Sequence, residues 1–142
     1  MILRATKLLP LCLTALVAAC VGGAVAVPPQ PLATALQNTN WKLASYDGEA
    51  VPSLITMRFG ADGSVSGLVI CNSFSSTARF SERAIELSNV TQTLLGCELS
   101  GNLAAQATVR KLLAQETVPA KVSSAGLELR VGRHRLLLVP QE

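Results

Sequence analysis

The residues of this chain that could carry chemistry begin with Cys71 and Asn72, which interrupt an apolar run in the stretch GLVICNSFSS (residues 67–76). A thiolate nucleophile needs a base beside it. The chain's single histidine, His134, lies far away in a basic, leucine-rich stretch, where we expect a structural role. Cys71, Cys97 and one histidine also fall short of the about four ligands of a zinc site, and C-x-x-C spacing is absent from the sequence. We therefore predict no catalytic residue, no metal site and no cofactor.

The first 19 residues have the features of an export signal. Arg4 and Lys7 precede an apolar run from Leu8 to Ala19. This run is shorter than the about 20 residues that span a bilayer, and it fits the apolar region of a secretory signal peptide. The domain organisation that we predict is a signal peptide (1–19), a tether (20–38) and one folded domain (39–142).

Two cleavage sites compete at the end of this signal. Leu16 to Cys20 resembles the bacterial lipobox, in which small residues precede a cysteine that becomes lipidated. Ala24-Val25-Ala26 fits ordinary signal peptidase. The apolar run ends at Cys20, so we expect lipidation there and a periplasm-facing anchor in the outer membrane. Cleavage after Ala26 would instead leave a soluble periplasmic protein.

Export also bears on charge and on the remaining thiols. Without residues 1–19, ten basic residues face nine acidic ones, and the net charge falls to +1. This balance gives little support to nucleic-acid binding. Cys71 and Cys97 are then the two thiols left in an oxidising compartment, where an isolated pair is most often a disulfide. The alternative is two buried free thiols.

Residues 20–38 contain no charge and include Pro28, Pro29 and Pro31. Prolines favour extended backbone, so we expect a tether that holds the domain away from a membrane. A disordered N-terminus would have the same sequence character.

From residue 40 onward the pattern is mostly that of β-strands. In residues 55–59, apolar Ile, Met and Phe alternate with Thr and Arg, the period of a half-buried strand. The turn Gly60–Gly63 joins this strand to 64–71, where Cys71 continues the apolar register. Strands are also expected near 41–46, 73–80, 84–90, 118–123, 127–131 and 134–139. We expect Trp41 to anchor the core and Asn72 to cap neighbouring backbone amides.

A helix is predicted at about residues 100–115. Ala105, Val109, Leu112 and Leu113 form an apolar stripe, and Ser100 or Asn102 could be the N-cap. The predicted fold class is therefore α+β: a curved, mostly antiparallel sheet, or partial barrel, of about seven to eight strands with one α-helix packed on it.

Several short motifs, taken in order, resemble the META domain, the family of the heat-inducible bacterial lipoprotein HslJ. They are the strand opening at Trp41, the pair Cys71-Asn72 after a hairpin, and Thr93 followed four residues later by Cys97. Many members have a glycine before the Cys-Asn pair, where this chain has Ile70. The resemblance covers roughly residues 38–142.

The resemblance implies an envelope protein with an α+β fold and no established catalytic activity, associated with heat shock, envelope stress and novobiocin resistance. The expected function is a non-enzymatic lipoprotein that contributes to stress tolerance. Its expected partners are the membrane, through the lipid anchor, and an envelope protein. Two alternatives remain: a carrier of small apolar ligands, which needs a cavity above about 300 Å³, and a protease-inhibitor-like module.

Overall fold

The computed structural model describes residues 31–52, 54–96 and 102–142, and these form nine strands and two helices. The strands are β1 (Thr39–Tyr46), β2 (Glu49–Ala50), β3 (Ile55–Phe59), β4 (Ser64–Val69), β5 (Asn72–Phe80), β6 (Ala84–Gln92), β7 (Thr117–Ser123), β8 (Gly126–Val131) and β9 (His134–Pro140). The helices are α1 (Leu32–Leu36) and α2 (Leu103–Leu113).

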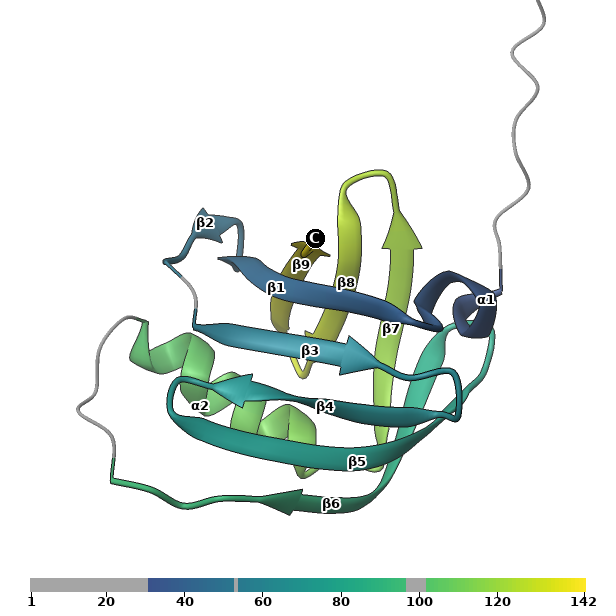
Figure 1. Ribbon diagram of the computed structural model, residues 1–142. Coiled ribbons are helices and arrows are strands. Elements are labelled where there is room, and N and C mark those ends of the chain that lie inside the picture. The colour runs from purple at the N-terminus through teal and green to yellow at the C-terminus, as the bar shows by residue number, and fades with distance from the viewer. Residues whose placement is uncertain (1–30, 53, 97–101) are drawn as a thin grey trace, which may run out of the picture.

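The strands form one antiparallel sheet that closes on itself (Figure 1). Its order is β2-β1-β3-β4-β5-β6-β7-β8-β9, and a further pairing of β1 with β9 joins the two sides. Eight strands thus make a barrel, and the short β2 pairs with the end of β1 outside it. The predicted α+β class and antiparallel sheet are confirmed, with a closed barrel instead of a partial one.

The barrel follows from the alternation of side chains along its strands. In β3, Ile55, Met57 and Phe59 are buried, whereas Thr56 and Arg58 point outward. An eight-stranded barrel has an interior just wide enough for side chains to fill. The buried apolar residues that the barrel strands contribute are Trp41, Leu43, Ile55, Met57, Phe59, Val65, Val69, Phe74, Ala78, Ile85, Leu87, Val118, Ala120, Leu127, Leu129, Val131, Leu136 and Leu138.

Gly67 sits opposite Phe74 in the middle of the β4–β5 pair. A Cβ at Gly67 would lie 2.0 Å from the carbonyl oxygen of Thr56 and 2.8 Å from the Phe74 ring. The absence of a side chain therefore lets Phe74 and the neighbouring strand approach the backbone closely.

Helix α2 is built as the sequence predicts. Its N-cap is Asn102, whose Oδ1 accepts a hydrogen bond from Ala105 N at 2.9 Å, while the other N-cap candidate, Ser100, lies outside the described residues. All four residues of the predicted apolar stripe are buried. Gln106 and Thr108, which are not part of the predicted stripe, are also buried. The apolar face of α2 is thus wider than the sequence pattern indicates, and it carries two polar side chains inward.

Helix α1 occupies the end of the stretch that we expected to be a tether. Leu32 and Leu36 lie one turn apart and are both buried, and the helix contacts β5 and β7. A helix of five residues is too short to show a period of 3.6, and for this reason the sequence does not reveal it.

Candidate functional site

Cys71 lies in the turn between β4 and β5, and Asn72 is the first residue of β5. Strand β4 ends at Val69, and Ile70 has a left-handed backbone with φ of 64°. The Ile70 amide donates to the carbonyl of Leu54 at 3.0 Å. Our prediction that Cys71 continues the buried register of β4 is wrong, because this left-handed residue turns the chain and leaves Cys71 exposed.

Asn72 and Thr93, two of the motif residues, are brought together by the pairing of β5 with the end of β6. The Thr93 hydroxyl donates to Asn72 Oδ1 at 3.1 Å and accepts from the Ser73 amide at 3.0 Å. The Leu95 amide donates to the same Asn72 Oδ1 at 2.6 Å, and Asn72 Nδ2 donates to the Leu95 carbonyl at 3.3 Å. Asn72 caps a backbone amide as expected, but this amide belongs to Leu95, 23 positions away, and not to a neighbouring residue.

The remaining motif residues have different positions. Trp41 is 5% exposed within the core, and its Nε1 donates to Thr39 Oγ1 at 2.8 Å, so its expected role as a core anchor is confirmed. Cys71 is disulfide-bonded. Cys97 and Cys20 lie outside the described residues, so the pairing of Cys71 with Cys97 and the lipidation of Cys20 stay predictions.

Large apolar side chains are exposed around this turn. Leu94 is 84% exposed, Leu54 63%, Leu95 61% and Leu68 45%. We call these four residues the leucine rim. Leu54 is bonded to the turn through Ile70, Leu95 through Asn72, and Leu68 pairs with Ser73. The start of β3, the β4–β5 turn and the segment after β6 lie at one side of the barrel (Figure 1).

Sequence reasoning missed the leucine rim as a site. A signal was available, because residues 87–97 contain no charged side chain and yet carry two adjacent leucines outside any periodic pattern. Such a pair has no assigned place in a sheet or helix, and this can indicate an exposed apolar site.

A second polar cluster joins β1, β9 and α2. His134 Nδ1 lies 2.8 Å from Asp47 Oδ2 and 2.9 Å from the Tyr46 hydroxyl, and the two rings stack with centroids 5.4 Å apart. Thr108 donates to the same Tyr46 hydroxyl at 3.2 Å. The Arg135 amide donates to Asp47 Oδ1 at 2.8 Å.

The hydrogen bonds of this cluster lower the pKa of the Asp47 carboxyl. The hydrogen bond from His134 is the largest cause of a lowered pKa at Asp47, followed by the bond from the Arg135 amide. A hydrogen bond between His134 Nδ1 and an ionised Asp47 carboxylate requires Nδ1 to be the donor, because a carboxylate oxygen only accepts. His134 is therefore engaged with Asp47 and Tyr46, which favours the structural role that we expected. The described residues contain no group of three or more metal-ligating side chains.

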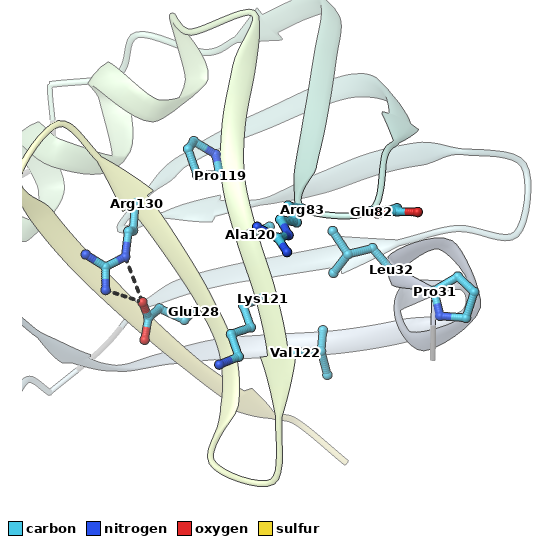
Figure 2. A pocket seen from close by; sticks show the side chains of 10 residues that line it. All are labelled: Pro31, Leu32, Glu82, Arg83, Pro119, Ala120, Lys121, Val122, Glu128 and Arg130. Carbon is cyan, nitrogen blue, oxygen red and sulfur yellow. Dashed lines mark hydrogen bonds and ion pairs between the residues drawn. The ribbon is translucent and has the colours of Figure 1, made fainter. Parts of the chain in front are cut away.

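An open groove of about 880 Å³ lies where α1 meets β7 and β8 (Figure 2). Its charged lining consists of Glu82, Arg83, Lys121, Glu128 and Arg130. Arg130 is paired with Glu128 at 2.8 Å, and the charges of both signs leave the groove without a dominant potential. The geometry does not single out a ligand class here.

Neither described helix is long and apolar enough to cross a membrane.

Comparisons with known proteins agree with this architecture. A family model described as "META domain" matches residues 34–142. The NMR structure of one protein aligns with a TM-score of 0.64 at 20% identity, over 78% of this chain and 95% of that chain. An NMR structure of a protein from Burkholderia xenovorans aligns with a TM-score of 0.60 at 18% identity, over 82% of this chain and 93% of that chain. At these identities the structural matches show the fold alone. No curated protein matches the sequence.

Proposed function

Because the chain belongs to the META domain family, we propose that it is a non-enzymatic, HslJ-like envelope lipoprotein that contributes to stress tolerance through interaction with a protein or a membrane surface. In this proposal Cys20 carries the lipid and the domain stands on the periplasmic face of the outer membrane. Labelling cells with a radioactive fatty acid tests the anchor. An unlabelled product would favour cleavage after Ala26 and a soluble periplasmic protein.

The observation that carries the interaction proposal is the leucine rim beside the motif. Exposed apolar patches on soluble domains mark interaction sites more often than scattered single residues do. Both polar atoms of the Asn72 side-chain amide form hydrogen bonds with the Leu95 backbone, while the Leu94 and Leu95 side chains are exposed to solvent. A side chain of the family motif thus stabilises the display of apolar surface.

The structure gives one argument against the carrier function and one against a catalytic thiol. A carrier needs an internal cavity, but Trp41, Met57 and Phe59 fill the barrel together with the leucines. Two grooves formed by the described residues are open and lie against the outside of the barrel. A thiolate nucleophile needs a free thiol, whereas Cys71 is disulfide-bonded.

Photo-crosslinking in intact cells tests the interaction. A photoreactive amino acid at Leu94 should give a reproducible adduct with a protein or a lipid, because this side chain is the most exposed of the leucine rim. The matched control is the same amino acid at Ala125, an exposed position in the β7–β8 turn. Adducts of equal yield at both positions, or at neither, would contradict the proposal.

A phenotype completes the test. Leu94→Ser with Leu95→Ser should lower survival under heat or novobiocin to the level of the deletion strain, while the amount of folded protein stays unchanged. Full survival of this double variant would separate the leucine rim from stress tolerance.

A further inference from the structure

The leucine rim is held by hydrogen bonds and is therefore a fixed surface. Leu95 is bonded through both its amide and its carbonyl, the Leu54 carbonyl accepts from Ile70, and Leu68 lies within β4. A loop that exposed leucines only transiently would not need these bonds. Binding through the leucine rim therefore requires little further loss of conformational entropy in the domain, which favours docking to a surface that already exists.

The sheet face that adjoins the rim has a one-sided charge. Cross-strand registers place Lys42, Thr56, Leu68 and Ser73 in one row across β1, β3, β4 and β5. The next row across the same face, continued into β6, consists of Asn40, Arg58, Ser66, Ser75 and Thr91.

These two rows carry two cations and no carboxylate. Lys42 and Arg58 are both exposed, and residues 63–78 and 87–97 contribute no charge of either sign. These two rows are complementary to a negatively charged surface, and none of their residues carries a charge that would repel one.

The side-chain composition of the leucine rim favours a bilayer over a protein as its partner. The centres of protein–protein interfaces are enriched in aromatic residues, Met and Arg, and leucine is under-represented among the residues that dominate binding. The rim is aliphatic throughout. A bilayer interface rewards aliphatic area that enters the acyl boundary, together with cations that face anionic headgroups.

We propose that the leucine rim docks onto a lipid bilayer with anionic headgroups, with Leu94 and Leu95 in the acyl boundary and Lys42 and Arg58 facing the phosphates. This inference rests on the proposed function, in which the rim is the interaction surface, and it names the partner. It also gives the orientation of the domain, with the β4–β5 turn toward the membrane and the β7–β8 turn away from it.

Tryptophan fluorescence of the full exported chain tests this orientation. The chain's one native tryptophan, Trp41, is buried in the core and gives a constant background. The reporter is Leu94→Trp, and the matched control is Ala125→Trp. Each variant is mixed with vesicles of phosphatidylglycerol and phosphatidylcholine, with and without bromine on the acyl chains. A lipid anchor holds both variants at the surface equally, so any difference between them comes from docking.

We expect a blue shift and strong quenching by brominated lipid for Leu94→Trp only. Adding Leu68→Ser and Leu95→Ser to the reporter should lower the ratio of docked to undocked molecules at least about tenfold. Replacing Lys42 or Arg58 by Gln should lower it about fivefold each on anionic vesicles and leave it unchanged on pure phosphatidylcholine.

Three outcomes would overturn the inference. Absence of quenching at position 94 together with a protein adduct in the crosslinking test would replace the bilayer by a protein and leave the proposed function standing. Absence of both signals would remove the proposed function as well. A blue shift that depends on protein concentration and needs no vesicles would identify a second copy of the chain as the occupant.

Discussion

The side chain of Asn72 pairs with the backbone of Leu95 in both directions, as a neighbouring strand would. Its Oδ1 accepts from the Leu95 amide at 2.6 Å and its Nδ2 donates to the Leu95 carbonyl at 3.3 Å. The regular β5–β6 ladder ends with Phe74 opposite Gln92, and Ser73 bonds Thr93 next. The side-chain amide of Asn72 thus continues this ladder beyond its last backbone pair. It holds in place the segment that carries the exposed Leu94 and Leu95.

Replacing Asn72 tests this role directly. Asn72→Ala removes the acceptor for the Leu95 amide and the Thr93 hydroxyl, and we expect a loss of about 1–3 kcal/mol in the free energy of unfolding. Amide hydrogen exchange at Leu95 should accelerate far more than exchange in β8. Asn72→Asp keeps the acceptor and loses the donor, so it should have an intermediate effect. Unchanged exchange at Leu95 in Asn72→Ala would show that this bond does not hold the segment.

Ile70 carries backbone strain that a glycine would relieve. A β-branched residue with φ of 64° is unfavourable because its Cβ crowds the backbone. Ile70→Gly should therefore raise the free energy of unfolding by about 1 kcal/mol, net of the greater chain entropy of glycine. The control is Ile70→Ala, which keeps a Cβ and should give no gain. Urea unfolding measures both, and equal stabilities of the two variants would contradict the strain argument.

The sequence predicts the barrel well and the site only in part, for a physical reason. Alternation along a strand and periodicity along a helix are local, and they correctly predict the inward residues of β3 and the buried stripe of α2. Hydrogen bonds between distant segments leave no such periodic trace. The contacts of Asn72 with Leu95 and of His134 with Asp47 span 23 and 87 positions, and they depend on which strands become neighbours.

The left-handed turn at Ile70 escapes prediction for a related reason. An isoleucine within an apolar run favours a continuing strand, and here the fold overrides that local preference. The helix α1 is short enough that its two buried leucines show no period. The resemblance to a known family supplied the pair of Asn72 and Thr93, whose proximity the residue pattern alone would not have indicated.

The Asp47–His134 pair should make the stability depend on acid pH. The pKa of the Asp47 carboxyl is lowered from 3.8, chiefly by the hydrogen bond with His134 and then by the Arg135 amide. A carboxyl whose pKa is lower in the folded than in the unfolded state contributes stability that is present above the unfolded value. This contribution is lost as the pH falls through the folded value.

Unfolding curves of the native chain and of Asp47→Asn, measured from neutral pH to about pH 2, test this dependence. The native chain should be the more stable at neutral pH. The two curves should approach each other below pH 3.8 and meet once the pH is also below the lowered pKa of the folded state. His134→Gln should reduce the difference without abolishing it, because the Arg135 amide still donates to Asp47. Parallel curves over the whole range would exclude a contribution from the Asp47 charge.

The predicted Cys71–Cys97 disulfide would fasten the same segment from a second point, since Cys97 follows Leu95 by two residues. A crosslink that closes a loop of about 27 residues contributes roughly 3–4 kcal/mol in the chain-entropy model. The free energy of unfolding should therefore fall by a similar amount in Cys71→Ser, in Cys97→Ser and in the double variant, because either substitution removes the crosslink. Mass spectrometry of the unreduced protein should find neither thiol open to alkylation, and two alkylated thiols would refute the crosslink.

The contributions of the disulfide and of the Asn72 side-chain hydrogen bonds to stability should also depend on each other. With the crosslink intact, the segment around Leu95 stays near β5 even when its hydrogen bonds are lost. Asn72→Ala should therefore cost more stability in the Cys71→Ser background than in the native chain, by about 0.5–1 kcal/mol in a double-mutant cycle. Additive losses of stability would mean that the disulfide and the Asn72 hydrogen bonds act on separate parts of the chain. The position of the exposed leucines would then depend on Asn72 alone.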